Sequence, residues 1–418
     1  MKAREPGTAQ ILARRARALG PTYALFYDEP LHIVRAEGVW MYDADGRRYL
    51  DAYNNVPVVG HCHPYVVDEL ARQARTLNTH TRYLSEQPLA LAERLLASLP
   101  SDIGNVVYAC TGSEANDLAV RISKAVTGGT GFIVTDYAYH GTTEAIAGMS
   151  PEDGAPLGPG VYTIPAPLGT EGAARFGERV RDCLERMRAA GIRPAALLVD
   201  TIFSSDGVAA DPPGFLAAAV AEIRSAGGLF IADEVQPGFG RTGEHMWGFQ
   251  RHGVVPDLVT MGKPMGNGHP VSALAARPAL LEAFARNTHY FNTFGGNSVS
   301  CAVALAVLDV IEKERLLANA QASGDCLRAG LSRLAHRYPS MGEIRGAGLF
   351  VGVELAATPT STARQEAARI VNDLRHRGVL VGTTGRDGNV LKIRPPLCIA
   401  PAEVELLLDA LEQSLARA

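Results

Sequence analysis

One lysine stands where a surface lysine would be unusual. Lys263 follows the apolar run "DLVTMG" and precedes a proline and several glycines, in "MGKPMGNGHP". A partly desolvated lysine loses proton affinity, and its neutral amine is a nucleophile. Taken alone, such a lysine is more often a surface group whose aliphatic stem lies on apolar residues. It therefore needs partners before it indicates covalent chemistry.

Other groups with chemical potential follow apolar runs of the same kind. Asp233 ends "GLFIAD", where a carboxylate is costly to bury without a cation. Gly112 and Ser113, after "NVVYAC", open a predicted helix whose free amides suit a phosphate. Tyr139 and His140, after "GFIVTD", supply an aromatic face and an imidazole. Taken singly, these groups are a structural salt bridge, a serine N-cap and packing residues.

Together these groups form the set that pyridoxal phosphate needs. The lysine amine binds its aldehyde, and the carboxylate keeps the pyridine nitrogen protonated, so that the ring withdraws electrons. The helix N-terminus takes the phosphate, and the aromatic side chain covers the ring. Because their coincidence at successive strand ends is improbable, the sequence predicts a pyridoxal-phosphate enzyme.

The elements that must position these groups alternate between residues 105 and 276. The apolar runs are "NVVYAC", "GFIVTD", "AALLVDT", "GLFIAD", "DLVTMG" and "PVSALAA", and helical stretches separate them. Such alternation favours an α/β fold with a mainly parallel sheet between two layers of helices. Ligands of these sheets bind beyond the carboxyl ends of the strands, where the candidate residues lie.

Three segments of domain size follow from this pattern. We expect a large domain over residues 56–315 and a smaller α+β domain over residues 316–418. Residues 1–55 should join the small domain, with a helix over Thr8–Leu19 and a hairpin that turns at Asp45-Gly46.

Composition narrows the class of protein. The chain of 418 residues has a formal net charge of −4, which argues against a polyanion binder, and no apolar stretch reaches the roughly 18 residues of a membrane helix. The six cysteines show no disulfide or zinc spacing, so we expect a reducing, cytoplasmic compartment. We interpret the basic start as an ordinary helix and not a transit peptide; it carries Lys2, Arg4, Arg14, Arg15 and Arg17 against Glu5.

The stretch from Phe230 to Gly268, with "ADEVQPGFGRTG" and "DLVTMGKPMGNG", resembles the signature of class III, fold-type-I aminotransferases. The similarity extends through "YLDAYNNVPVVGHCHP", "CTGSEANDLAVRISK", "YHGTT", "NTFGGNSVSCAVALAVL" and "IRGAGLFVGVEL". It implies that Lys263 is the Schiff-base lysine and proton shuttle and that Asp233 pairs with the pyridine nitrogen.

The resemblance also assigns further residues to the cofactor. Gln236 would reach its phenolic oxygen, Val235 and Tyr139 would pack on the two ring faces, and Gly112 and Ser113 would hold the phosphate. Thr293 would complete the phosphate site from the neighbouring subunit, which implies a homodimer.

The predicted substrate side departs from the family pattern. Lys392, in "LKIRPPL", stands where family members that act on ω-amino acids usually have an arginine for the carboxylate. A lysine is a point charge and not a bidentate fork. Ser205 stands near the place of a glutamate that gates this arginine in several relatives. Tyr53 and Asn54 are expected to line the substrate pocket.

Two reactions stay open. "NNVPVVGHCHP", "LNTHTRYL" and "MGKPMGNGHPV" are similar to the branch of phospho-lyases that act on ethanolamine phosphate or phosphohydroxylysine. Arg82 matches a cation of that branch, whereas Ala24 replaces a second one. We therefore rank amine transfer from an amine or ω-amino acid to a 2-oxo acid first, and phosphate elimination second. His61 and His63 in "GHCHP" have no neighbouring third ligand, so we predict a structural loop and no metal.

Overall fold

The computed structural model describes residues 7–417, so the predicted roles of Lys2, Arg4 and Glu5 lie outside it. The helix expected over Thr8–Leu19 is present. The helices are α1 (Thr8–Leu19), α2 (Pro64–Thr76), α3 (Glu86–Ala97), α4 (Gly112–Thr127), α5 (Glu144–Ala147), α6 (Gly169–Ala174), α7 (Phe176–Ala189), α8 (Leu216–Ser225), α9 (Pro278–Ala285), α10 (Ser298–Lys313), α11 (Leu316–Arg337), α12 (Ala363–His376) and α13 (Pro401–Leu415), with short 3₁₀ turns at Glu152–Gly154 and Gly248–His252.

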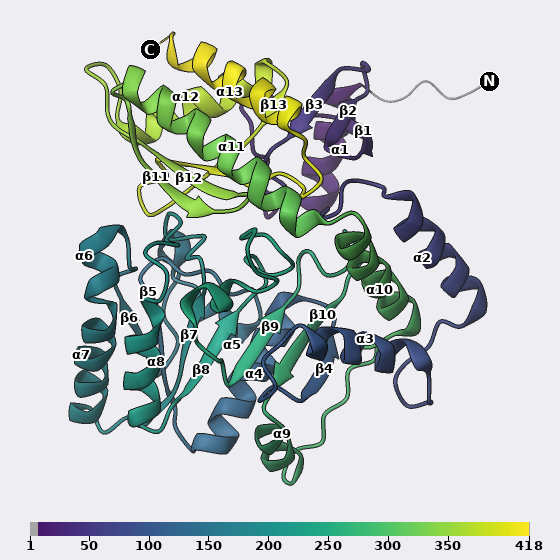
Figure 1. Ribbon diagram of the computed structural model, residues 1–418, viewed down its shortest axis with the longest axis vertical. Helices are drawn as coiled ribbons and strands as arrows, with labels where there is room; N and C mark the ends of the chain where they lie inside the picture. The colour runs from purple at the N-terminus through teal and green to yellow at the C-terminus, as the bar shows by residue number, and fades with distance from the viewer. Residues whose placement is uncertain (1–6, 418) are drawn as a thin grey trace.

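A seven-stranded sheet forms the centre of the larger part of the molecule (Figure 1), in the order β4-β10-β9-β8-β7-β5-β6. Its strands are β4 (Asn105–Ala109), β5 (Gly131–Thr135), β6 (Val161–Ile164), β7 (Pro194–Asp200), β8 (Leu229–Asp233), β9 (Leu258–Met261) and β10 (Ser272–Ala276). The neighbouring strands β6, β5, β7, β8 and β9 are parallel to one another. Strand β10 is antiparallel to both of its neighbours, β9 and β4. The fold is therefore the mainly parallel α/β fold that the sequence predicts, although β6 was not expected.

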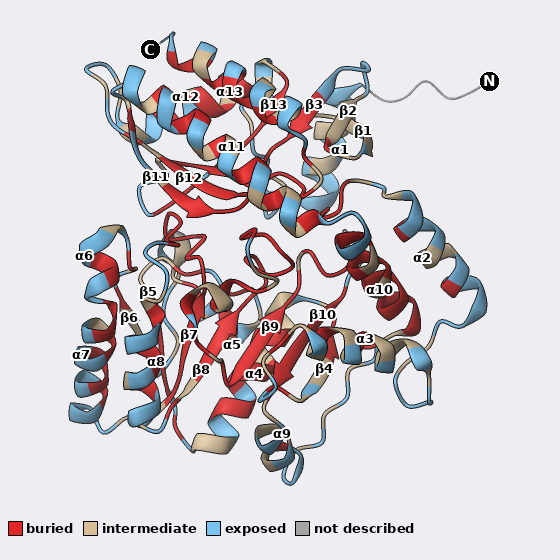
Figure 2. Cartoon of the chain, viewed as in Figure 1, coloured by how far each residue is buried: buried red, intermediate tan, exposed pale blue. Residues whose placement is uncertain are grey.

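The register of the central strands sets the site. Asp200 pairs with Asp233, and Asp233 pairs with Thr260, so the carboxyl ends of β7, β8 and β9 meet at one edge of the sheet. These strands are buried on both faces (Figure 2), which explains their continuous apolar runs.

Two four-stranded sheets lie above the large sheet in Figure 1. One pairs the N-terminal strands with a C-terminal strand, in the order β1-β2-β3-β13, and β3 and β13 are parallel. The other has the order β11-β12-β15-β14. The strands are β1 (Ile33–Glu37), β2 (Trp40–Asp43), β3 (Arg48–Asp51), β11 (Met341–Ala347), β12 (Phe350–Leu355), β13 (Val379–Leu380), β14 (Gly382–Thr384) and β15 (Val390–Ile393).

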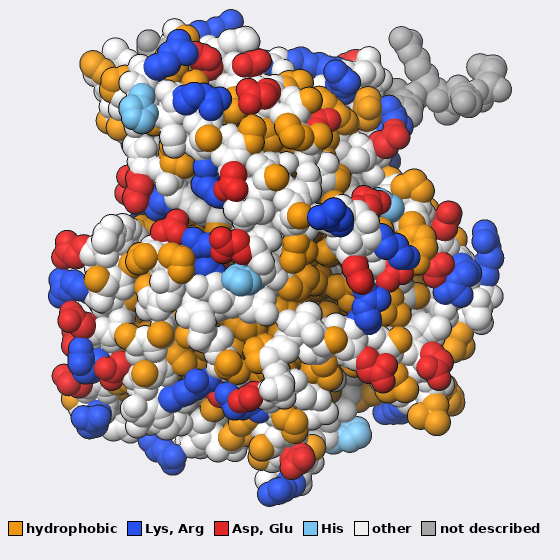
Figure 3. All heavy atoms as spheres, in the orientation of Figure 1, with side chains coloured by type: hydrophobic (Ala, Val, Ile, Leu, Met, Phe, Trp, Pro, Cys, Tyr) orange, Lys and Arg blue, Asp and Glu red, His pale blue; other side chains and the backbone are white. Residues whose placement is uncertain are grey.

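The exterior carries charges of both signs, interspersed over the face that Figure 3 shows. Within residues 7–417, no helix has the length and apolar character needed to cross a membrane.

The domain boundaries near residues 55 and 315 stay a prediction, since helix α11 follows α10 after two residues and leads directly into the C-terminal strands.

Candidate active site

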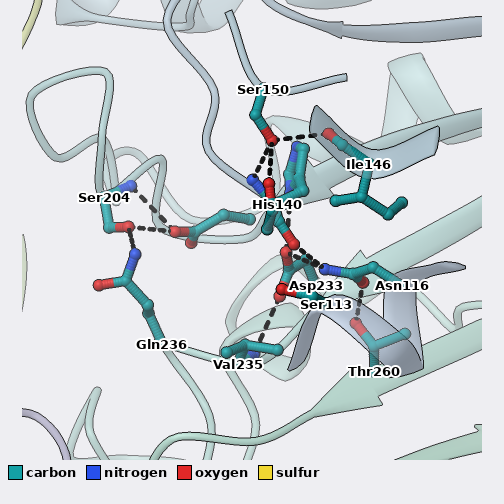
Figure 4. Close-up of polar contacts among 12 residues, drawn as sticks. Ser113, Asn116, His140, Ile146, Ser150, Ser204, Asp233, Val235, Gln236 and Thr260 are labelled. Carbon is teal, nitrogen blue, oxygen red and sulfur yellow. Dashed lines mark hydrogen bonds and ion pairs between the residues drawn. The ribbon is translucent and has the colours of Figure 1, made fainter. Parts of the chain in front are cut away.

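Asp233 ends β8 and is held by three hydrogen bonds (Figure 4). Its Oδ2 lies 2.7 Å from Nδ1 of His140 and accepts from Nδ2 of Asn116 at 2.9 Å. Its Oδ1 accepts from the backbone N–H of Val235 at 3.0 Å. Asn116 is oriented in turn by Thr260, whose hydroxyl donates to its Oδ1 at 2.6 Å. These bonds fix the orientation of the carboxylate that is predicted to pair with the pyridine nitrogen.

Lys263 lies two residues after β9, on the turn that Gly262 begins. Burial lowers the pKa of the Lys263 amine, and the charge of Arg394 lowers it further. Its Nζ lies 5.9 Å from the centre of the Tyr139 ring. The lysine therefore faces the aromatic side chain with a reduced proton affinity, as the sequence predicts for a nucleophilic amine.

The N-terminus of α4 differs in detail from the sequence-based interpretation. Thr111 is the N-cap, and it forms a capping box with Glu114, so the alternative of a serine N-cap at position 113 is wrong. The Ser113 hydroxyl instead accepts from the backbone N–H of Thr142 at 3.0 Å. A Cβ at Gly112 would lie 2.8 Å from a methyl of Val235, so only glycine allows this approach.

Gln236 belongs to a polar chain that crosses the site (Figure 4). Its Nε2 donates to the Ser204 hydroxyl at 2.5 Å, and Ser204 donates to the carboxylate of Asp200. Its Oε1 accepts from Nη1 of Arg394. Arg394 also donates from Nε to the backbone oxygen of Tyr53 at 2.8 Å. The chain links the predicted cofactor side of the site to the predicted substrate side.

The cavity beside Lys263 brings together most of the predicted cofactor residues. The lining residues are Gly112, Ser113, Tyr139, His140, Gly141, Asp200, Asp233, Val235, Gln236 and Lys263. Of these, only Gly141 and Asp200 were not proposed from the sequence. Asp200 ends the run "AALLVDT" as Asp233 ends its own, so the same signal marks it. Asn116 and Thr260, which orient Asp233, carried no such signal.

The predicted substrate residues lie in three places. Tyr53 and Asn54 line a neighbouring, more apolar cavity, together with Phe26. Lys392 is buried on β15, where burial, followed by the charge of Arg394, holds its pKa well below the usual value.

Arg82 and Thr293 are exposed and do not line the Lys263 cavity of this chain. The guanidinium of Arg82 covers the Phe291 ring, with Cζ 4.0 Å from the ring centre.

Comparisons with known proteins agree with this geometry. The family model for class-III aminotransferases matches residues 23–415. The chain belongs to the class III aminotransferase family. An alanine–glyoxylate aminotransferase 2-like protein of Drosophila melanogaster is 39% identical to this class III protein, over 92% of this chain and 82% of its own. A mitochondrial homologue of the same name from Arabidopsis thaliana is 37% identical, over 99% and 88%.

Solved structures of this class III fold add a second name. A phospholyase from Arthrobacter, in complex with phosphoethanolamine, is 41% identical, with a TM-score of 0.94 over 98% of this chain and 100% of its own. An ornithine aminotransferase from Toxoplasma gondii is 26% identical, with a TM-score of 0.84 over 98% of this chain and 94% of its own, and it has pyridoxal phosphate at partial occupancy in its active site. This chain is thus an enzyme of a family that depends on pyridoxal phosphate, with the fold-type-I architecture.

The residues of the cavity fit that cofactor. Asp233 presents a fixed carboxylate, Val235 and Tyr139 line the space for a ring, and Nε2 of His140 is buried without a partner among the described residues. A Cβ at Gly141 would lie 2.3 Å from the Ser113 hydroxyl, so two glycines, Gly112 and Gly141, shape the end of the cavity at the start of α4. When bound, pyridoxal phosphate would supply an electron-withdrawing ring to a substrate amine.

Proposed function

We propose that this enzyme moves an amino group from an amine or ω-amino acid to a 2-oxo acid by a ping-pong mechanism. The family membership and the relatives named as alanine–glyoxylate aminotransferases support this reaction. The observation in this chain that carries the proposal is a pair of buried cations on the substrate side, Lys392 and Arg394.

These two cations suit a carboxylate. Neither has an ion-pair partner among residues 7–417, and burial lowers the pKa of each. Arg394 is held by the Tyr53 backbone and by Gln236, which leaves its charge uncompensated by any direct carboxylate contact. A carboxylate of an ω-amino acid or of a 2-oxo acid would supply the missing negative charge.

The site residues divide the work. Lys263, with its lowered proton affinity, would bind the cofactor aldehyde and then take and return the proton of the substrate carbon. Asp233 would keep the pyridine nitrogen protonated. Gly112 and Ser113 would hold the phosphate at the start of α4, and Tyr139 and Val235 would hold the ring between them.

A half-reaction assay tests the proposal. The purified protein, loaded with pyridoxal phosphate, is mixed with a panel of amines and ω-amino acids, and the cofactor absorbance is followed. Amino donors should bleach the visible band, and a 2-oxo acid such as glyoxylate or pyruvate should restore it with formation of the corresponding amino acid. A panel in which no donor changes the absorbance, while the Lys263→Ala control behaves identically, would contradict the proposal.

A phospho-lyase is the second candidate, and two similarities favour it. The Arthrobacter phospholyase is similar over the whole chain, and an ethanolamine-phosphate phospho-lyase homologue of Caenorhabditis elegans is 35% identical. Lys392 and Arg394 would then face a phosphate. The same preparation is incubated with phosphoethanolamine, and inorganic phosphate is measured. Phosphate release without any 2-oxo acid, together with no amino transfer, would place elimination first.

We infer that the enzyme works as a homodimer, with Thr293 completing the partner's phosphate site. Exposed apolar side chains cluster near this residue in the sequence and near Arg82; Tyr83, Leu84 and Phe294 are 66%, 101% and 68% exposed. An apolar surface of this kind supports an interface. Light scattering should give twice the chain mass, and Thr293→Ala should weaken cofactor binding without changing that mass.

Arg82, which lies on the same surface, would contact an anionic group of the substrate. Arg82→Ala with unchanged KM for every anionic substrate would reject that role.

We also propose a cytoplasmic location. All six cysteines are free, as a reducing compartment would keep them, although two relatives are named as mitochondrial. Fractionation of the source cells tests the location.

A further inference from the structure

We propose that Asp51 and His61 form a clasp that positions the substrate loop, and that this is the role of the motif "GHCHP". The clasp joins the two ends of residues 51–61, the segment that carries Tyr53 and Asn54. Neither side chain lines the cavity of Lys263. Asp51 lines the neighbouring cavity together with Tyr53 and Asn54, whereas His61 lines neither cavity and so acts by positioning. The kinetic tests of the clasp rest on the proposed function, because they measure amine transfer.

Asp51 organises the start of the loop. Asp51 is buried, with 1% of its surface exposed. Its Oδ1 accepts from the backbone N–H groups of Tyr53 and Asn54, at 3.1 and 2.9 Å. Its Oδ2 lies 2.7 Å from Nε2 of His61. One buried carboxylate thus satisfies two loop amides and one imidazole, and its removal would leave all three without that partner.

His61 fixes the end of the loop to a separate strand connection. Its backbone N–H donates to the Gly38 oxygen at 2.7 Å, and its backbone oxygen accepts from the Gly38 N–H at 3.0 Å. Just before it, Val59 and Gly60 are bound by the side chain of Asn267, which belongs to the turn after Lys263. The end of the loop is therefore tied to the lysine turn.

The interior of the loop touches the site directly. Asn55 donates from Nδ2 to the backbone oxygen of Gln236 at 2.9 Å. The backbone oxygen of Tyr53 accepts from Nε of Arg394, whose guanidinium carbon also lies 4.6 Å from the Tyr53 ring centre. If the clasp opens, the Tyr53 oxygen loses its fixed place, and Arg394 loses one of its two polar partners. The clasp should thus affect substrate affinity before it affects the chemical step.

A matched pair of histidines makes the test sharp. His61→Ala removes the clasp. His63 lies two residues further along the chain, and His63→Ala removes a different imidazole–carboxylate contact, the 2.9 Å pair with the half-exposed Glu314. We expect His61→Ala and Asp51→Ala to raise KM for the amino donor about tenfold while kcat changes less than about threefold. Asp51→Asn, which keeps an acceptor for the two amides, should restore part of the affinity, and His63→Ala should match wild type.

The double variant Asp51→Ala/His61→Ala tests the coupling. Because the imidazole acts only through the carboxylate, the KM of the double variant should be no higher than that of Asp51→Ala. Additive effects, unchanged KM in both single variants, or a fall in kcat at constant KM would each overturn the proposal. If Asp51→Ala does not fold, His61→Ala decides the question alone, because the His61 side chain is 12% exposed and tolerates truncation better.

Amide hydrogen exchange separates this proposal from the proposed function. In the cofactor-loaded protein without substrate, the Tyr53 and Asn54 amides should exchange faster in His61→Ala than in wild type or His63→Ala. Equal exchange in all three proteins would overturn the clasp. If wild type transfers no amino group, only the proposed function fails, and the exchange comparison still decides the role of the clasp.

Discussion

Asp233 and Lys392 are both buried charged groups, yet the protein surrounds them differently. Asp233 receives hydrogen bonds from His140, Asn116 and the Val235 backbone. The Lys392 ammonium group has no hydrogen-bond or ion-pair partner within residues 7–417. Burial and then the charge of Arg394 lower its pKa, and the charges of Asp200 and Glu152 offset this only in part. The carboxylate of Asp233 is thus held by direct contacts, whereas no carboxylate within residues 7–417 directly contacts Lys392 or Arg394. The difference agrees with the proposal that a substrate carboxylate contacts these two cations.

The largest effect should come from the lysine that both sides share. Lys263→Ala removes the amine that binds the cofactor and moves the proton, so the rate of amino transfer should fall at least about a thousandfold. Borohydride treatment of wild type, followed by mass spectrometry, should place the reduced cofactor on Lys263. A label on another residue would refute the assignment of the whole cavity.

Asp233→Asn removes the negative charge on the cofactor side of the site. The substituted amide keeps the shape but loses the charge, and its NH₂ group would face donors that now bind Oδ2. The kcat should fall at least about a hundredfold, because the ring no longer withdraws electrons well. Asp257→Asn is the matched control: Asp257 is also buried, but it binds Arg224, Arg277 and the Phe230 backbone. That variant should lose stability and keep its kcat.

On the substrate side, Lys392→Met should act through affinity. Without the buried ammonium group, KM for a carboxylate-bearing substrate should rise about tenfold, while KM for a simple amine of similar size should change little. Initial rates with matched donor pairs measure the difference. A uniform change for both donors would show that Lys392 does not discriminate the carboxylate.

The same contrast explains what the sequence could predict. Lys263, Asp233, Gly112 and Tyr139 each follow an apolar strand, and parallel strands deliver such residues to one edge by topology alone. Asn116 was missed because its contact with Asp233 spans 117 residues and depends on how α4 packs on the sheet.

The substrate side was harder for a related physical reason. Arg394 meets Gln236 and Tyr53 across separate elements that are 158 and 341 residues away in the chain. No local periodicity encodes such a meeting. The role of His61 likewise depends on a carboxylate ten residues away that a loop brings back. Strand β6 escaped notice because "VYTI" is short and only partly buried.

The smallest expected effect is a pH-dependent change in stability at Lys392. Its pKa is lowered by burial in the folded protein, so the unfolded chain binds more protons at any pH between that pKa and the usual value. Stability should therefore rise with pH through this window. Lys392→Met removes the burial cost, so it should raise the thermal midpoint by a few degrees near neutral pH, and the gain should shrink as the pH approaches about 10.5. Thermal unfolding of both proteins across this range measures it.

Lys313→Met provides the opposite sign. The bond of Lys313 to Asp309 raises the pKa of this exposed lysine, so its contribution is present at neutral pH and is lost as the pH rises. This variant should lose a little stability near neutral pH and none at high pH. Lys392→Met could instead lower the thermal midpoint at neutral pH. That result would mean that the buried ammonium group has a compensating partner, and it would contradict the proposal that a substrate anion is needed there.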